Sequence, residues 1–375
     1  MSLQVAEITR FIRTVGAART RLSFQARGPK AHPNLVGSMK AYELHPREGF
    51  SSLQLVERAS PALSSDYDVR VRVRAASLNF RDLVIAKGAF KRDKRVIPLS
   101  DGAGEVIAVG SRVKRLKVGD RVAANFFPTW LSGELKAEHH EQALGGSVDG
   151  MLSEEVVLPE SAWLEIPEHY SFEEAATLPC AAVTAWHALF EAAHLKPGDQ
   201  LLVQGTGGVS LFALQLGLQA GARVIATSSS AEKRARLSEL GAGFTIDYKQ
   251  TPEWGDAARA ASAGGNGVDL VVEVGGAGTF DQSVKALRFG GTLSLIGVLT
   301  GAKGSINTYA ILQKNVRVHG VYVGSVALFE ALLRALDSSK IKPIIDQTFA
   351  FGEARAAYEH VESGKHFGKV VIKVD

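Results

Sequence analysis

Two kinds of hydrophobic pattern divide the chain. Between residues 39 and 167, short runs alternate apolar with polar positions, as at 69–74 and 104–109, and glycine and proline separate them, which predicts antiparallel strands. Beyond residue 171, apolar runs alternate with helix-length segments, which favours parallel βαβ units. In this second part we expect strands at residues 200–204, 223–227, 244–248, 269–274 and 292–298.

These patterns predict an α/β protein with two domains. A doubly wound parallel-sheet domain of the Rossmann type would span residues 168–324, inserted into a smaller β-rich domain made of residues 39–167 and 325–375. The 375 residues, 46% of them hydrophobic, are enough to bury two cores. No apolar run approaches the roughly 20 residues that cross a bilayer, so we expect no membrane-spanning segment.

The net charge of +4 is concentrated at the N-terminus. Residues 1–38 carry six basic side chains and only Glu7 as an acid, so the rest of the chain is nearly neutral and gives no argument for nucleic-acid binding. Apolar residues recur at helical spacing beside the arginines of this basic extension, which is typical of an organelle transit peptide; an unstructured extension is the alternative. We therefore expect a cytoplasmic protein, or a mitochondrial one if residues 1–38 target it.

A glycine turn is the most informative local motif. It follows the apolar run 200–204 directly and precedes a helix-like segment, and in such a turn backbone N–H groups can approach a pyrophosphate at the positive end of the helix. An ordinary tight βα turn is the alternative. The position after a strand and before a βαβ unit favours dinucleotide binding by the residues of the turn, Gly205, Thr206, Gly207, Gly208, Val209 and Ser210.

The end of the next predicted strand indicates which dinucleotide binds. Sites for NAD place an acidic residue there to bind the ribose 2′-hydroxyl, but this chain has serines after residue 227 and no carboxylate at the strand end. We expect NADPH, with its 2′-phosphate bound by Ser228 and Ser229 together with Lys233 or Arg234. The alternative is that the serines cap a helix whose basic residues face solvent.

Several separated motifs resemble those of one known family. They are residues 77–82 (SLNFRD), 100–106 (SDGAGEV), 118–122 (VGDRV), 178–185 (LPCAAVTA) and 367–370 (FGKV). With the glycine turn, they make residues 39–375 similar to the medium-chain dehydrogenase/reductases, and most similar to the zinc-type alcohol dehydrogenase-like branch near the quinone oxidoreductases. The resemblance implies a GroES-like fold for the β-rich domain, a nicotinamide cofactor, a small-molecule substrate and a homodimer that pairs through an edge strand at 316–323.

The residues at the zinc-ligand positions of that family argue against zinc. Asn79 stands where the zinc-dependent members have their first cysteine, and Ser100 with Asp101 replaces their His-Glu pair. Only Cys180 matches a ligand, and a catalytic zinc needs three. A single cysteine also excludes the four-cysteine structural zinc site and any internal disulfide. The histidines at 139 and 140 are adjacent, so they do not face one centre, and a solvated loop is expected there.

Without zinc, the remaining chemistry is hydride transfer to a quinone or an α,β-unsaturated carbonyl. Arg81 stands where the zinc-dependent members have a proton-relay Ser or Thr; it would polarise the substrate, and pairing with Asp82 and phosphate binding are the alternatives. The resemblance implies that Asn79 and Thr184 lie near the nicotinamide. It also implies cofactor contacts for Val274, Gly297, Val298 and Lys369. No residue stands out as the general acid, and solvent is one source of the proton. The alternatives are an alcohol dehydrogenase or aldehyde reductase that retains zinc, and a non-catalytic NADPH-binding redox sensor.

Overall fold

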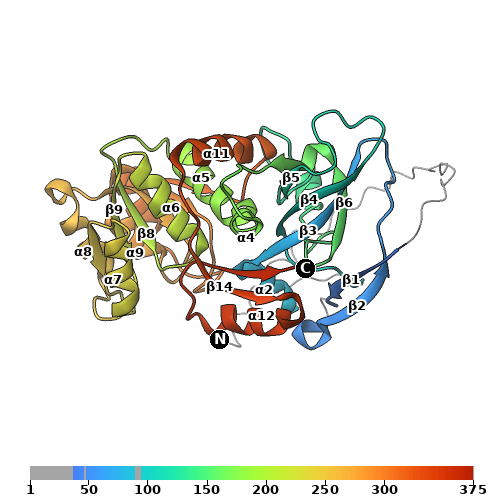
Figure 1. Ribbon diagram of the computed structural model, residues 1–375. Helices are drawn as coiled ribbons and strands as arrows, with labels where there is room; N and C mark the ends of the chain where they lie inside the picture. Colours follow the sequence, from blue (N-terminus) through green and yellow to red (C-terminus); the bar gives the residue numbers. More distant parts are fainter. Residues whose placement is uncertain (1–36, 46–47, 89–93, 375) are drawn as a thin grey trace.

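The computed structural model describes residues 37–45, 48–88 and 94–374 (Figure 1). Apart from its last two residues, the basic extension lies outside this described part, and so does the targeting prediction. In the described part, no helix is long and apolar enough to cross a membrane.

A seven-stranded, mostly antiparallel sheet forms the first domain, at the right of Figure 1. Its strands run in the order β14-β15-β3-β4-β5-β7, and β6 pairs with β3. Long alternating runs of valine build the central strand β3, whose inward residues enter one core. The strands are β3 (Asp68–Leu78), β4 (Asp101–Val109), β5 (Arg121–Ala124), β6 (Glu155–Pro159), β7 (Trp163–Glu165), β14 (Ile345–Ala350) and β15 (Lys369–Lys373).

A small hairpin and four short helices complete this domain. The hairpin pairs β1 with β2 in antiparallel register. The helix α2 begins after Asn79, and its first turn is closed by Asp82, whose carboxylate accepts a hydrogen bond from the Asn79 backbone N–H at 2.8 Å. The remaining elements are β1 (Ser38–Glu43), β2 (Gln54–Ala59), α2 (Phe80–Ala86), α3 (Ala137–His140), α4 (Phe172–Ala175) and α12 (Ala354–Ser363).

A six-stranded parallel sheet in the order β10-β9-β8-β11-β12-β13 forms the second domain. Successive side chains of a strand enter opposite cores: Leu201 and Val203 pack on one face, and Leu202 on the other. Both faces are therefore covered, as expected for a doubly wound sheet. The strands are β8 (Gln200–Gln204), β9 (Arg223–Thr227), β10 (Phe244–Ile246), β11 (Val268–Glu273), β12 (Leu287–Leu295) and β13 (Arg317–Gly320).

The helices of the parallel sheet lie on both of its faces. One face is covered by α6 together with a continuous helix whose α-helical turn α5 is flanked by two π-type segments, Leu178–Ala182 and His187–Ala192. The other face packs against α8 and α9. The helices are α5 (Val183–Trp186), α6 (Gly208–Gln219), α7 (Ala231–Glu239), α8 (Trp254–Ala261), α9 (Phe280–Ala286), α10 (Thr308–Lys314) and α11 (Val326–Ser339).

The structure corrects three predicted strand ends. The predicted strand 292–298 begins earlier, at Leu287, and ends at Leu295, and the one at 316–323 ends at Gly320. The strand predicted at 244–248 stops at Ile246. After Gly320 the chain stays apolar because Val321 and Val323 enter a buried core. After Leu295, the apolar residues Ile296 and Val298 are only partly buried.

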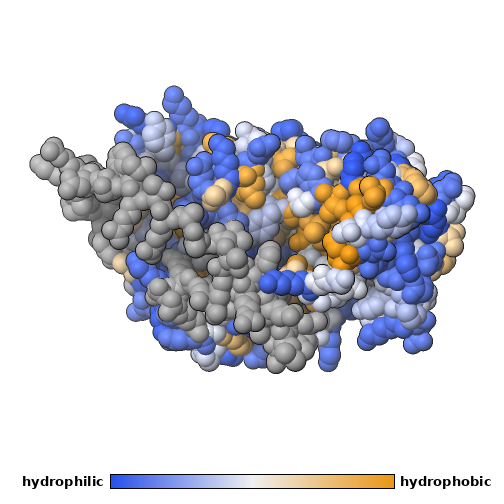
Figure 2. Space-filling view, turned by 180° about the vertical axis from the view of Figure 1, so that it is seen from behind, coloured by the Kyte–Doolittle hydropathy of each residue, from blue (hydrophilic) through white to orange (hydrophobic). Residues whose placement is uncertain are grey.

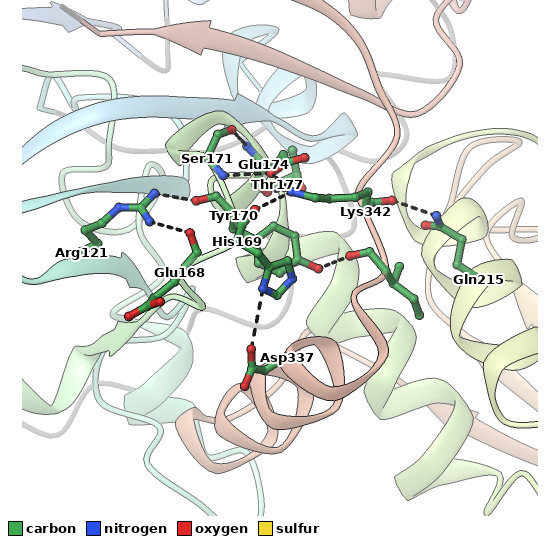
Figure 3. Close-up of polar contacts among 11 residues, drawn as sticks. Arg121, Glu168, His169, Tyr170, Ser171, Glu174, Thr177, Gln215, Asp337 and Lys342 are labelled. Carbon is green, nitrogen blue, oxygen red and sulfur yellow. Dashed lines mark hydrogen bonds and ion pairs between the residues drawn. The ribbon is translucent and has the colours of Figure 1, made fainter.

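A polar network joins the two domains beside α11 (Figure 3). Lys342 Nζ lies 2.7 Å from the Glu174 carboxylate, and the Tyr170 hydroxyl donates to the Ile341 carbonyl. Arg121 donates to the Tyr170 carbonyl at 2.5 Å. These bonds link β5 and α4 of the first domain to the segment that returns from the second.

Candidate cofactor and substrate site

The glycine turn joins β8 to α6 as predicted. Gly205 has φ +69°, a left-handed conformation that favours glycine, and Gly207 caps α6. A Cβ at either position would meet no atom within 4 Å, so the backbone here faces open space. Thr206 and Ser210 are buried, and the Ser210 hydroxyl donates to the Gln204 carbonyl at 2.6 Å. An exposed glycine backbone before a helix N-terminus fits a pyrophosphate.

Beyond the turn, the site is closed by the first domain. Gly368 pairs with Gly207 in a parallel bridge, and its N–H donates to the Thr206 carbonyl at 2.9 Å. A Cβ at Gly208 would lie 2.6 Å from Cδ of Lys369 and 3.1 Å from Cβ of Ala181, so a larger residue would displace the Lys369 side chain. Val209 is partly exposed in the same turn.

Glu273, at the end of β11, is the centre of a saturated polar network. Its carboxylate accepts hydrogen bonds from Gly275 N (2.7 Å), Gly276 N (2.9 Å), the Thr279 hydroxyl (2.6 Å), Gln204 Nε2 (2.8 Å) and the Ser283 hydroxyl. Glu273 is fully buried. Every polar side-chain atom of this Glu273 network therefore has a partner, and the network fixes the ends of β8 and β11 against each other.

The predicted cofactor contacts Val274, Gly297 and Val298 follow this network. A Cβ at Gly297 would lie 2.1 Å from the Val274 carbonyl oxygen, so the close approach of the two backbones requires glycine. Val298 packs with Ala302 against Val84 of α2, which brings this loop to the first domain. The cofactor contacts themselves remain predictions.

The residues expected around a 2′-phosphate lie at the end of β9. Ser228 is buried and Ser229 half-buried, while Ser230 caps α7 by accepting a bond from Lys233 N. Lys233 Nζ donates to the Gly364 and His366 carbonyls, at 3.0 and 2.7 Å.

Arg234 donates to the Ser228 carbonyl at 3.0 Å and forms an ion pair with Asp247 at 2.7 Å. Both predicted cations therefore have protein partners, and they border the serines without being free.

Strand register brings three polar residues together at the domain junction. Ser77 of β3 pairs with Asp101 of β4, and Leu78 pairs with Val370 of β15, so Asn79, Asp101 and Lys369 become neighbours. Lys369 Nζ donates to Asn79 Oδ1 at 2.5 Å and to the Leu78 carbonyl at 2.7 Å.

Lys369 is 3% exposed and its ammonium points inward, although it was expected to contact the pyrophosphate; that contact stays a prediction. Burial raises the pKa of Asp101, 3.8 Å from Lys369 Nζ, and the ammonium partly offsets this.

Arg81, at the start of α2, has unsatisfied donors. Its Nη1 donates to the Leu144 carbonyl at 2.8 Å and lies 3.4 Å from Asp82, and its guanidinium stacks 4.6 Å above the Phe126 ring. Its Nε and Nη2 are buried without a hydrogen-bond partner. Nδ2 of Asn79 also lacks a partner within hydrogen-bond geometry, although it is near enough to Asp101 to lower the pKa of that carboxyl. Buried donors without acceptors are costly, which makes an oxygen-bearing ligand the expected partner.

The residues at the zinc-ligand positions do not fit zinc. Asn79 Oδ1 already accepts from the Lys369 ammonium, which places a cation beside it. Cys180 is the only one of these residues that zinc commonly takes as a ligand in such a site, and a catalytic zinc needs three protein ligands. Among the described residues, no three His, Cys, Asp or Glu side chains could hold a metal together. Thr184, the third predicted catalytic residue, is buried on α5, on the same continuous helix as Cys180.

Tyr322 is a site residue that the sequence did not indicate. It follows β13 and packs against Phe127 (centroids 5.5 Å apart) and Phe126 (6.2 Å), and it stacks on His140 at 5.3 Å. His140 is therefore not merely a solvated loop residue. Burial is the main cause that raises the pKa of Tyr322, and the charge of Arg81 opposes it.

The two domains also match known protein families. Residues 65–168 match the alcohol dehydrogenase GroES-like domain, and residues 208–338 match the zinc-binding dehydrogenase family. The chain is 42% identical to the zinc-type alcohol dehydrogenase-like protein C1773.06c of Schizosaccharomyces pombe, over 87% of this chain and 96% of that protein.

Two solved structures are similar throughout. The putative alcohol dehydrogenase from Sinorhizobium meliloti 1021 superposes with a TM-score of 0.83 at 39% identity, covering 90% of this chain and 99% of that one. The quinone oxidoreductase from Coxiella burnetii superposes with a TM-score of 0.74 at 28% identity, covering 90% of this chain and 100% of that one.

Proposed function

This chain belongs to the medium-chain dehydrogenase/reductase superfamily, as a zinc-type alcohol dehydrogenase-like member, and we propose that it is an NADPH-dependent reductase of quinones or α,β-unsaturated carbonyls that works without zinc. One observation carries this proposal: Asn79, at a position where the zinc-dependent members have a ligand, and Arg81, at their proton-relay position, have buried donors with no acceptor. Such donors suit an oxygen that gains negative charge during a reduction.

The cofactor would lie along the carboxyl ends of the parallel strands. The turn Gly205–Ser210 would hold the pyrophosphate, and Val274, Gly297 and Val298 would border the nicotinamide. When bound, a reduced nicotinamide supplies a hydride. The preference for NADPH rests on Ser228 and Ser229, at a strand end that carries no carboxylate.

Arg81 has the central role in this proposal. Its Nε and Nη2 would donate to the substrate oxygen, while the bond to the Leu144 carbonyl and the contact with Phe126 hold the guanidinium in place. Asn79 would contribute its Nδ2, because Lys369 can only donate and so fixes Oδ1 toward itself. Thr184 would border the nicotinamide from α5.

The proposal is tested by the rate of NADPH and NADH consumption with benzoquinone, crotonaldehyde, an enone, an aldehyde and an alcohol as substrates. We expect turnover of the quinone or the conjugated carbonyls, with NADPH preferred. Oxidation of alcohols that depends on added zinc would contradict the proposal. Tight NADPH binding with no turnover of any of them would instead favour a binding protein.

We also propose that two copies of this chain pair through β13. All four residues of this edge strand are exposed, and among them Val318 is 42% exposed. In the preceding helix α10, Tyr309 is 66% exposed and Leu312 is 74% exposed. Figure 2 shows the molecule from behind, and hydrophobic surface is visible there on the half that holds the parallel sheet. Light scattering should give a dimer mass, and Leu312→Glu a monomer; a monomeric wild-type protein would refute the pairing.

A further inference from the structure

We propose that Tyr322 is the proton donor of this site and that its substrates are conjugated enals and enones, whose reduction needs a proton on carbon. This inference rests on the proposed reductase function and extends it. A quinone gains a hydride to become a hydroquinone anion, whose oxygen takes a proton from water unaided. An enal gains the hydride at its β-carbon and becomes an enolate, whose α-carbon must still be protonated.

The position of Tyr322 in the fold supports this role. It follows the carboxyl end of β13, the edge of a parallel sheet at which ligands bind. The backbone around it is held on both sides: Val321 N donates to the Leu295 carbonyl at 2.9 Å, and His187 Nδ1 contacts the Val323 carbonyl at 2.7 Å. Tyr322 is thus fixed relative to the end of β12.

Backbone strain marks the same segment. Val323 is buried with φ +56°, a left-handed conformation that is rare for a β-branched residue. Leu99, immediately before Ser100 and Asp101, also has a left-handed φ of +67° and is fully buried. Strained residues of this kind persist where the surroundings hold them, and they cluster at functional sites.

Phe126 links the Tyr322 ring to Arg81. Phe126 contacts both, with the guanidinium of Arg81 4.6 Å from its centroid and the Tyr322 ring 6.2 Å away. The positive charge of Arg81 lowers the pKa of both Tyr322 and His140, although burial is the larger effect on each group, raising the tyrosine pKa and lowering the histidine pKa. Since both groups pack on Phe126, in the proposed complex the substrate oxygen binds the free donors of Arg81 and the α-carbon faces Tyr322.

Tyr322 is also 38% exposed, which gives it access to water. In the proposed step, its O–H bond breaks as a C–H bond forms at the α-carbon of the enolate. The resulting phenolate is stabilised by Arg81 and regains a proton from water. One hydride and one proton are thereby added across the C=C bond, while the nicotinamide is oxidised.

The test compares Tyr322→Phe with Tyr248→Phe, because Tyr248 is another exposed tyrosine, 41% exposed, at the far edge of the parallel sheet. For crotonaldehyde, Tyr322→Phe should lower kcat by about 10²–10⁴-fold, the usual contribution of a general acid. Turnover of benzoquinone and NADPH binding, measured by fluorescence titration, should stay within about threefold of wild type. Tyr248→Phe should change none of these.

A second readout separates proton donation from packing. Tiglaldehyde carries a methyl group on its α-carbon, so protonation there creates a stereocentre. Wild type should give one enantiomer in excess, and Tyr322→Phe a nearly equal mixture. Equal kcat losses for enal and quinone, or an unchanged enantiomer ratio, would overturn the role of Tyr322 and leave the reductase proposal standing. Absence of NADPH turnover by wild type with both substrates would overturn both.

Discussion

Two polar clusters, one around Glu273 at the end of β11 and one around Arg81 and Asn79 at the start of α2, differ in one respect. In the Glu273 network each polar side-chain atom has a partner, with five hydrogen bonds to the Glu273 carboxylate alone. Around Arg81 and Asn79, three buried donor atoms have none. A saturated network stabilises the fold, whereas unsatisfied donors cost stability and are retained where a ligand completes them.

Removal of the Glu273 carboxylate should give the largest loss of stability. Glu273→Ala leaves several buried donors without an acceptor, so the free energy of unfolding should fall by about 4 kcal/mol in urea titrations. Exposed Glu239 is the matched control, and Glu239→Ala should change it by less than about 0.5 kcal/mol. A loss below about 1 kcal/mol for Glu273→Ala would mean that the network is not structural.

Replacement of Arg81 should lower activity strongly and stability only slightly, the opposite of Glu273→Ala. Arg81→Met removes hydrogen-bond donors that have no acceptor in the protein and would bind the substrate oxygen. The kcat/KM for a conjugated carbonyl should therefore fall by about 10²–10³-fold, as for a lost oxyanion donor. The free energy of unfolding should change less than in Glu273→Ala. The control is Arg112→Met, since Arg112 also stacks on an aromatic ring, 5.9 Å from that of Tyr67, but is exposed. Full activity of Arg81→Met would contradict the idea that the unsatisfied donors around Arg81 bind the substrate.

The pH dependence of stability should show the free-energy cost of ionising the buried Asp82 carboxyl beside Arg81. Burial raises its pKa to about 6, and Arg81 partly offsets this, so the folded state holds the proton more tightly than the unfolded chain. Stability should therefore fall as pH rises from about 4 to 6, by roughly 3 kcal/mol from this group alone.

The matched measurement is the denaturation midpoint at several pH values. Asp82→Asn should lose this decline relative to wild type, whereas exposed Asp66→Asn should keep it. Parallel pH profiles for wild type and Asp82→Asn would show that Asp82 is ionised in the folded state without cost.

The smallest effect is expected at Ser228, where the 2′-phosphate of the cofactor would bind. Ser228→Asp adds a negative charge where a 2′-phosphate would bind, so the ratio of kcat/KM for NADPH to that for NADH should fall by about tenfold or more. Because Ser228 is buried, the new carboxylate also costs stability, so both rates are measured on protein shown to be folded. An unchanged ratio would place the 2′-phosphate elsewhere.

The sequence predicted the geometry of the glycine turn better than that of the side-chain cluster. The turn Gly205–Ser210 is contiguous and follows a strand, so its pattern was sufficient to place it between β8 and α6. The Arg81 cluster is assembled from separate segments, and only the register of β3 with β4 and β15 brings Lys369 to Asn79. The inward direction of the Lys369 ammonium follows from that register and not from local pattern.

The sequence did not predict that Tyr322 packs at the domain junction, because the apolar run 316–323 continues beyond the end of the sheet. Alternation assigned it to an edge strand, whereas β13 ends at Gly320 and the chain turns into the domain junction. Gly320 and Gly324, which flank the tyrosine, were the available signal that the strand is interrupted.

The central claim is that reduction here needs no metal, and one measurement addresses it directly. Protein treated with a chelator, with its zinc content determined by mass spectrometry, is assayed for NADPH oxidation with crotonaldehyde. The account predicts full turnover at far less than one zinc per chain, unchanged by Cys180→Ala. Stoichiometric zinc that is lost with Cys180→Ala, together with the activity, would contradict it.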